Sequence, residues 1–296
     1  MVKPISEKIL ITGGTGFIGR YLVSTLLKAE FKVYNPNRET LNLLDYNSTN
    51  NYLKDLDPKY VIHLACTSSH PKNCNDKELI VSDLDMIHNL IEAMYKNTKL
   101  IISGSVSEYG KSGVLSENKK CYPDTCYGIA KFRSNTLASK LCKKKNIDLL
   151  VLRLFGVYGP GEAAYRLFPS LLESIKNNVD FHMSDGLQIR DFIHVSDVCS
   201  VIKLILNLKK FPTGILNLGT GIGLQLIDVC NKIIKESSCL TTKLIHSKSR
   251  NLTDKDILVS NNKAIEALLG LRIPQRLNKK NILDLFDLNY CNKLVI

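Results

Sequence analysis

The sequence lacks the segments that mark membrane-spanning and secreted proteins. No apolar run in the 296 residues approaches the roughly 18 residues that a membrane-spanning helix needs. The N-terminus also lacks the basic, apolar and small-residue pattern of a signal peptide. We therefore expect a soluble, cytoplasmic protein that does not bind a membrane.

Patterns for metal ligands and disulfides are missing as well. There is no C-x-x-C motif, and no His stands at zinc-finger spacing from a Cys. The cysteines are odd in number, and we interpret them as reduced thiols that serve as small apolar residues, with no bound metal. They stand at positions 66, 74, 121, 126, 142, 199, 230, 239 and 291.

Aromatic residues are scarce, at 7% of the chain, whereas basic residues give a formal net charge of +12. Nucleic acid is the first partner that such a charge suggests. However, basic runs such as Lys143–Lys145 are short and have no aromatic side chains between them. We expect no nucleic acid binding, and the charge instead suits small polyanionic ligands.

A glycine-rich turn follows the first apolar run of the chain. Lys8–Thr12 has the composition of a buried parallel strand, and a helical pattern begins after the turn at residues 13–19. In this order, Gly13 permits the tight turn, Gly16 lets the backbone approach a pyrophosphate, and Gly19 lets the helix pack on the strand. The helix N-terminus then offers free N–H groups to phosphates, so the segment predicts a dinucleotide site.

Apolar runs and helical patterns alternate along the first half of the chain, which predicts an α/β fold with a doubly wound parallel Rossmann sheet and a smaller C-terminal lobe. We place the dinucleotide-binding domain at residues 1–160, joined by a later strand near 215–219. Residues 161–296, with short helices and loops, form mainly the substrate lobe. The further predicted strands are Lys32–Tyr34, Tyr60–Leu64, Leu100–Ser103, Leu149–Leu154 and Ile215–Leu218, and the clearest helices are Leu84–Tyr95 and Tyr127–Lys143.

Tyr127 and Lys131 lie one helical turn apart, so both point to the same face of the predicted helix. A phenol has a pKa of about 10. Lowering this pKa toward neutrality requires about 4 kcal/mol of stabilisation of the phenolate relative to the phenol, and a nearby ammonium helps to supply it. Ser105, at the end of a predicted strand, adds a hydroxyl. Together the three side chains predict proton transfer to or from a substrate oxygen beside a nicotinamide ring.

With these motifs in family order, the chain resembles the extended short-chain dehydrogenase/reductase family of the NAD-dependent epimerase/dehydratase type. Its nearest resemblance is to nucleotide-sugar 4-ketoreductases such as GDP-fucose-synthase-like enzymes. The resemblance implies an enzyme that acts on a nucleotide-diphosphate sugar, and a homodimer. The blocks that carry it are Thr12–Gly19, His63–Ala65, Ser105 with Tyr109–Gly110, Tyr127–Lys131, Leu152–Gly161, Gln188–Val195 and Leu216–Gly221.

The resemblance also assigns site residues. It implies that Ser105, Tyr127 and Lys131 are catalytic, and that Ser105, Ser107, Arg190 and Arg250 bind the substrate. The cofactor residues that it implies, besides Tyr127 and Lys131, are Gly13, Thr15, Gly16, Phe17, Ile18, Gly19, Asn35, Arg38, Asn42, Leu43, Leu64, Ala65, Phe155 and Val157.

The end of the second predicted strand favours NADP over NAD. A site for NAD places an acidic residue there, whereas a 2′-phosphate favours an Arg. This chain has Asn35 and Arg38 and no carboxylate at the expected position. The alternative is that Arg38 is an ordinary exposed residue and that NAD binds through Asn35.

The residues after Ser105 narrow the reaction. Val106 and Ser107 stand where hexose 4,6-dehydratases of this family carry an acid and a base, and Glu108 is adjacent. The resemblance therefore favours a 4-ketoreductase in surface-polysaccharide sugar biosynthesis, in which Tyr127 donates a proton. A 4-epimerase that uses NAD is the alternative; a dehydratase and a nonenzymatic dinucleotide sensor are further ones.

Several positions depart from the family pattern or admit a structural interpretation. Gly156 and Asp83 each stand where many relatives carry Asn. Arg190 could pair with Asp191 or cap a turn instead of binding phosphate. His63, which follows an apolar run, is more typical of a packed, hydrogen-bonded residue than of a catalytic one.

Overall fold

The computed structural model describes residues 7–67, 77–237, 241–250, 252–278 and 282–286. The chain forms two compact units. The first unit comprises residues 1–110, 117–154 and 199–217, and the second comprises 111–116, 155–198 and 218–296. The first unit ends its second stretch at residue 154, whereas we predicted a domain boundary at 160. The short segment 111–116 also belongs to the second unit.

The first unit is built on a six-stranded sheet with the strand order β10-β6-β4-β3-β1-β2. The pairs β1–β2, β1–β3, β3–β4 and β4–β6 are all parallel. The chain therefore moves outward from β1 in both directions, which confirms the predicted doubly wound Rossmann sheet. The strands are β1 (Lys8–Thr12), β2 (Lys32–Tyr34), β3 (Tyr60–His63), β4 (Lys99–Ser105), β6 (Asp148–Leu154) and β10 (Gly214–Leu218).

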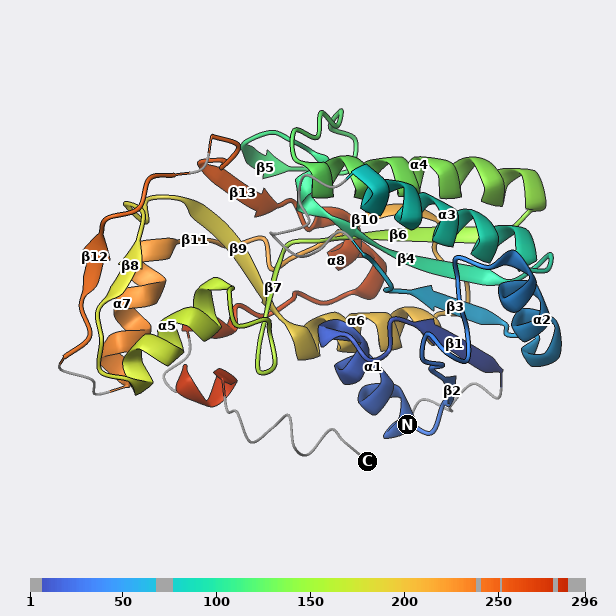
Figure 1. Ribbon diagram of the computed structural model, residues 1–296, viewed down its shortest axis with the longest axis horizontal. Coiled ribbons are helices and arrows are strands. Elements are labelled where there is room, and N and C mark those ends of the chain that lie inside the picture. The colour runs from blue at the N-terminus through green and yellow to red at the C-terminus, as the bar shows by residue number, and fades with distance from the viewer. Residues whose placement is uncertain (1–6, 68–76, 238–240, 251, 279–281, 287–296) are drawn as a thin grey trace. The chain divides into compact units, whose positions relative to one another are not determined.

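Helices cover both faces of this sheet. Figure 1 shows α3 and α4 on one face and α1 and α6 on the other, and α2 packs beside α3. A parallel sheet covered on both faces needs consecutive apolar residues in its strands, as at 9–11 in β1 and 60–62 in β3. The helices are α1 (Phe17–Leu27), α2 (Tyr46–Leu56), α3 (Lys77–Ala93), α4 (Cys126–Lys145) and α6 (Val195–Leu206), with the short 3-10 helix η2 (Val106–Glu108) after β4.

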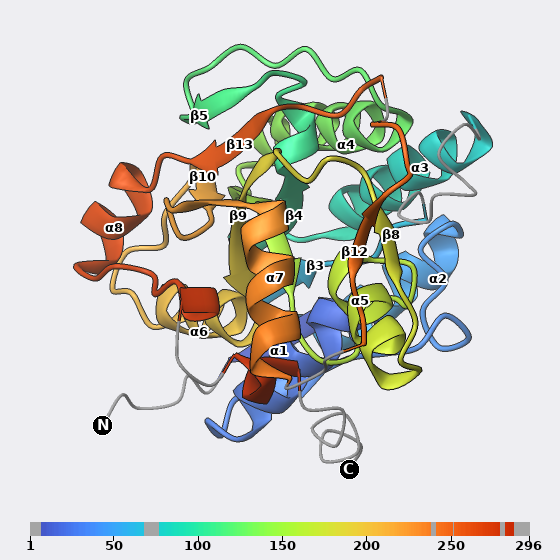
Figure 2. The ribbon, with the colours of Figure 1, turned by 90° about the vertical axis from the view of Figure 1, so that its left-hand side faces the viewer.

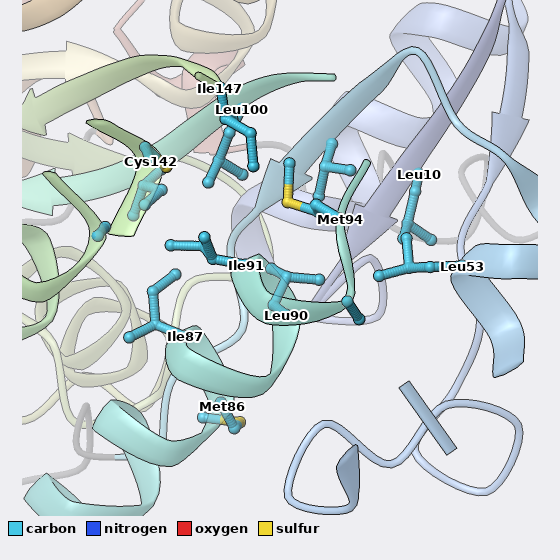
Figure 3. Close-up of a cluster of buried hydrophobic side chains, with 14 of the residues drawn as sticks. Leu10, Leu53, Met86, Ile87, Leu90, Ile91, Met94, Leu100, Cys142 and Ile147 are labelled. Atoms are coloured by element: carbon cyan, nitrogen blue, oxygen red, sulfur yellow. The ribbon is translucent and has the colours of Figure 1, made fainter. Parts of the chain in front are cut away.

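The core of the first unit lies between the sheet and helices α2, α3 and α4. Helix α3 repeats apolar side chains at helical spacing, and Ile87, Leu90 and Ile91 are fully buried. They belong to the same buried cluster as Leu10 of β1 and Leu100 of β4, part of which Figure 3 shows. This packing fixes the positions of the strand ends, where ligands bind in folds of this kind.

The second unit contains several strands, where we expected mainly short helices and loops. A five-stranded sheet has the order β11-β9-β13-β5, with β7 paired to β9, and β12 pairs with β8 beside α5 and α7 (Figure 2). Many of these strands have three residues, too few for an alternating pattern to show in the sequence. The elements are β5 (Gly113–Leu115), β7 (Gly156–Tyr158), α5 (Leu167–Lys176), β8 (Phe181–Met183), β9 (Ile189–His194), β11 (Gly223–Gln225), α7 (Leu226–Glu236), β12 (Leu244–His246), β13 (Ile257–Ser260), α8 (Lys263–Leu269), η3 (Arg276–Asn278) and η4 (Leu283–Phe286).

Within the described ranges, none of the helices has the length and apolar character needed to cross a bilayer. Nor do His, Cys, Asp and Glu side chains of the same ranges gather into a group that could hold a metal ion. The cysteines described there, at 66, 121, 126, 142, 199 and 230, form no disulfide with one another. Cys74, Cys239 and Cys291 lie outside the described residues.

Candidate active site

The glycine-rich turn lies where β1 meets the end of β3. Gly13 has a φ of +73°, which favours glycine, and a Cβ there would lie only 2.6 Å from the backbone nitrogen of Ala65. A Cβ on Gly19 would collide with the carbonyl oxygen of Gly13. Leu64 and Ala65, both predicted to contact the cofactor, therefore lie directly against the turn. These close backbone approaches are what a dinucleotide fingerprint requires.

Helix α1 begins at Phe17, directly after the turn, and Gly16 is its N-cap. Because glycine has no side chain, the first amide groups of the helix receive no side-chain cap. Thr15 and Gly16 are exposed, and Phe17 and Ile18 are partly so. This helix terminus is consequently open, and binding of an anionic ligand there stays a prediction.

The end of β2 also reaches the glycine turn. A Cβ on Gly14 would lie 2.8 Å from the Cβ of Asn35. Arg38 follows on an exposed loop, where no described carboxylate forms an ion pair with it. The side chain of Asn42 accepts a hydrogen bond from the backbone of Leu44 at 3.2 Å. Leu43, in contrast, is buried in the core, so only its backbone is available to a ligand.

Ser105 ends β4 and caps η2. Its Oγ accepts a hydrogen bond from the Ser107 nitrogen at 3.1 Å, while its own nitrogen donates to Oε1 of Glu108 at 2.8 Å. This capping box satisfies the first donors of the short helix and fixes the backbone of Ser105.

Glu108 is fully buried and serves as a structural anion. Its Oε2 pairs with Nε of Arg153 at 3.0 Å, and its Oε1 also accepts from Nδ2 of Asn135 at 2.8 Å. Burial lowers the pKa of Arg153, but Glu108 and Tyr109 more than offset this and raise it. The Glu108 carboxylate is therefore engaged by β4, α4 and β6 together.

Helix α4 brings Tyr127 and Lys131 to the end of β4. Thr125 is the N-cap of α4, and its Oγ1 accepts a hydrogen bond from the backbone nitrogen of Gly128 at 3.0 Å. A Cβ on Gly128 would collide with the carbonyl oxygen of Ser107, so a glycine here lets α4 approach the turn after Ser105. The two segments that carry the predicted catalytic residues thus meet through backbone contact.

The ammonium of Lys131 is buried beside the Tyr127 ring. Its Nζ lies 6.0 Å from the ring centroid of Tyr127 and 3.4 Å from Oγ of Ser103. Burial alone would lower the pKa of Lys131, but neighbouring groups, first Cys66 and then Tyr127, raise it above its usual value. Lys131 is therefore charged at neutral pH and can favour the ionised form of Tyr127.

His63 ends β3 as a packed, hydrogen-bonded residue. Its Nδ1 lies 2.7 Å from Oγ1 of Thr12. Burial, reinforced by the charge of Lys131, lowers the pKa of His63 to about 3. The imidazole is neutral at physiological pH.

This pKa predicts acid sensitivity. In the unfolded chain, the pKa of His63 is 6.5, whereas in the folded protein it is about 3. Protonation below pH 6.5 therefore favours the unfolded chain. The stability contributed by neutral His63 is fully present above pH 6.5 and is lost as the pH falls toward 3. The loss is about 1.4 kcal/mol per pH unit over that window. Urea unfolding of His63→Gln at pH 7 and at about pH 4.5 should show a smaller pH dependence than the wild type. His88→Gln, at an exposed position of α3, should leave the pH dependence unchanged.

Arg190 and Arg250 lie in the second unit, each bound to carboxylates. Arg190 pairs through Nη2 with Asp254. Arg250 contacts Asp185 and Asp256, both at 2.7 Å. The two guanidinium groups are thus gathered in one network around β9 and the segment before β13, and phosphate binding by them stays a prediction.

The alternative pairing of Arg190 with Asp191 is not what the structure shows. Asp191 is buried, and it accepts hydrogen bonds from the backbone nitrogens of Thr220, Gly221 and Ser260 at 2.8, 2.9 and 3.1 Å. These bonds tie β9 to the loop after β10 and to β13. Arg190 therefore has a different partner from its neighbour in the sequence.

Gly156 has a packing reason for its departure from the family pattern. It opens β7, and a Cβ there would lie 2.8 Å from the carbonyl oxygen of Asp191 in β9. An Asn at this position would not fit without moving the two strands. Phe155 and Val157, predicted to contact the cofactor, flank Gly156 and belong to the second unit.

Known proteins are similar to this chain in sequence and in fold. The chain is 26% identical over 230 residues to the GDP-6-deoxy-D-talose 4-dehydrogenase of Aggregatibacter actinomycetemcomitans, covering 75% of this chain and 77% of that enzyme. The structure of RMD from Pseudomonas aeruginosa complexed with NADPH is similar, with a TM-score of 0.82, 19% identity and coverage of 92% of this chain and 95% of that one. So is the UDP-glucose 4-epimerase of Thermus thermophilus in complex with NAD, with a TM-score of 0.77, 22% identity and coverage of 90% and 94%.

A sequence model described as the NAD dependent epimerase/dehydratase family matches residues 9–219. This span begins in β1, includes the glycine turn, Ser105, Tyr127 and Lys131, and ends after β10. The chain therefore belongs to the NAD dependent epimerase/dehydratase family, within the extended short-chain dehydrogenases/reductases.

Proposed function

We propose that this protein reduces the 4-keto group of a nucleotide-activated 4-keto-6-deoxy sugar with NADPH, in the biosynthesis of surface-polysaccharide sugars. The observation that carries the proposal is the buried Lys131 ammonium beside Tyr127, at the strand end that holds Ser105. Ser105 holds the substrate oxygen by hydrogen bonding, Tyr127 donates a proton to it, and Lys131 stabilises the charge that Tyr127 then carries.

The residues of the first unit fit a nicotinamide dinucleotide. The turn at Gly13 and Gly19 leaves no room for side chains, and the N-terminus of α1 is open. The pyrophosphate would lie at this turn, and Asn35 and Arg38 would hold the adenosine ribose and its 2′-phosphate. When bound, the dinucleotide supplies the hydride.

The environment of Ser105 argues against elimination of water. Val106 and Ser107 carry no carboxylate, and Glu108 is committed to Arg153, Asn135 and the backbone of Ser105. A carboxylate held in this way is not free to act as a base toward a substrate. Hydride transfer with proton donation is the chemistry that the remaining groups support.

An NAD-dependent nucleotide-sugar 4-epimerase is the second candidate. It would use Ser105, Tyr127 and Lys131 twice, first to oxidise the sugar and then to reduce it from the other face. The similarity to a UDP-glucose 4-epimerase in complex with NAD supports this alternative. The lack of a carboxylate at the expected position after the second strand and the presence of Arg38 favour the reductase.

The deciding experiment gives one preparation of the protein the substrates of both candidate reactions. NADPH is mixed with enzymatically prepared GDP-, dTDP-, UDP- and CDP-linked 4-keto-6-deoxyhexoses, and the absorbance of the reduced nicotinamide is followed. Loss of absorbance with one of them supports the reductase. If none is reduced and a UDP-hexose is converted to its 4-epimer, the reductase proposal is wrong.

Sedimentation in the same buffer tests the proposed homodimer.

The choice of NADP predicts a selective effect of Arg38→Ala. A charge-assisted Arg–phosphate bond contributes about 1.5–3 kcal/mol, so the variant should bind NADPH roughly tenfold to a hundredfold more weakly. NADH has no 2′-phosphate, and its affinity should change little. Calorimetric titration measures both affinities.

Lys32→Ala is the matched control for Arg38→Ala, because Lys32 is exposed and begins β2 at the opposite end of that strand. It removes the same charge without touching the predicted phosphate site. Equal losses of NADPH and NADH affinity in Arg38→Ala would remove the argument for NADP.

A further inference from the structure

Asp83 joins helix α3 to the turn that follows β3. Its side chain is buried, and Oδ1 accepts hydrogen bonds from both the backbone nitrogen and the Oγ1 of Thr67, each at 2.7 Å. Its Oδ2 accepts from the thiol of Cys66 at 3.2 Å. Three donors thus face the carboxylate, as its ionised form requires.

The turn held by Asp83 is part of the candidate site. Cys66 and Thr67 directly follow Ala65, whose backbone nitrogen would meet a Cβ on Gly13. The anchor therefore fixes one wall of the glycine turn. Because the anchoring residue is a carboxylate and not a neutral amide, it also brings a negative charge to this wall.

That charge acts on Lys131. Burial lowers the pKa of Lys131, whereas Cys66, Tyr127, Asp83 and Glu108 raise it, in that order. Among these groups Glu108 is already paired with Arg153. Lys131 lowers the pKa of His63 and Asp83 raises it, but burial dominates, so His63 is neutral at physiological pH. The Asp83 carboxylate is thus one of the groups whose negative charge offsets the Lys131 ammonium.

We propose that Asp83 is a positioning residue of the candidate active site, which anchors the Cys66–Thr67 turn and offsets the charge of Lys131 so that Tyr127 keeps its proton. The proposal rests on the proposed function, in which Tyr127 is a proton donor. Lys131 alone favours the phenolate, which cannot donate. A negative charge near the pair favours the phenol and extends proton donation to higher pH.

The test measures the ionisation of Tyr127 without requiring turnover. The chain has no tryptophan, so the tyrosinate absorption band can be followed directly. The difference between the wild type and Tyr127→Phe gives the titration midpoint of Tyr127. The same difference in the Asp83→Asn background gives the midpoint without the charge. Asn keeps an oxygen that accepts the bonds from Thr67, so it removes the charge and retains the anchor.

We expect Asp83→Asn to lower the midpoint of Tyr127 by about one pH unit. Lys131 should stay charged, because Cys66, Tyr127 and Glu108 still act on it. Asp85→Asn is the matched control, since Asp85 lies on the same helix but is exposed, and it should leave the midpoint unchanged. Asp83→Ser is the second charge-removing variant, to be used if Asp83→Asn does not fold.

An unchanged or higher midpoint in these variants overturns the proposal, as does an equal shift in Asp85→Asn. Where keto-sugar reduction is detected, the high-pH limb of kcat should move down by the same amount in Asp83→Asn. If no keto sugar is reduced, the proposed function fails, and the absorbance titration still decides the role of Asp83. The two failures are therefore distinguishable.

Discussion

Replacing Tyr127 by Phe is expected to lower kcat for keto-sugar reduction by about 10³-fold, within the range that a positioned general acid contributes. The variant removes the hydroxyl that donates the proton, while the ring that lies 6.0 Å from Nζ of Lys131 remains. Tyr127 is partly exposed on α4, so the fold should tolerate the change. Stopped-flow absorbance of the reduced nicotinamide measures the rate, and calorimetry measures dinucleotide affinity.

Tyr122→Phe provides the matched control, because Tyr122 precedes α4 and its side chain is exposed. It loses the same hydroxyl outside the predicted catalytic group, and its kcat should equal that of the wild type. Dinucleotide affinity should be unchanged in Tyr122→Phe, and in Tyr127→Phe it should fall far less than kcat, because only one hydroxyl of the predicted cofactor contacts is lost. Retention of full activity by Tyr127→Phe would contradict the proton-donor role, whatever the substrate.

The first unit could be predicted from the sequence because its signals are local. β1, the glycine turn and α1 follow one another without interruption, and each has its own pattern, a short apolar run, three spaced glycines and a helical repeat. The strands of the second unit gave no such signal. β8 and β12 have three residues each and pair across more than sixty positions, so nothing in either segment indicates its partner.

The candidate site shows the same limit. Tyr127 and Lys131 were predictable because a helix brings residues four positions apart to one face. The ion pair between Glu108 and Arg153 spans 45 positions and depends on the adjacent strands β4 and β6. Asp83 likewise reaches Thr67 only once α3 has packed against the sheet. Long-range polar pairs of this kind have no spacing rule from which to predict them.

Glu108→Ala is expected to have the largest effect on stability. Removing one partner of a buried ion pair leaves the other charge unpaired, at a cost of about 3–5 kcal/mol in the free energy of unfolding. Arg153 is only 4% exposed, so water cannot replace the lost carboxylate without opening the core. The variant also removes acceptors for the Ser105 nitrogen and for Asn135. Urea unfolding at neutral pH measures the loss.

Glu92→Ala tests whether this cost comes from burial and not from the loss of a Glu as such. Glu92 pairs with Lys145 at 3.7 Å, with side chains that are 31% and 23% exposed, and its removal should cost less than about 1 kcal/mol. The double variant E108L/R153L should recover part of the loss, because it leaves no unpaired charge. A Glu108→Ala protein as stable as Glu92→Ala would contradict the buried-pair explanation. Glu108 would then be free to take a chemical role beside Ser105, and elimination chemistry would return as a candidate.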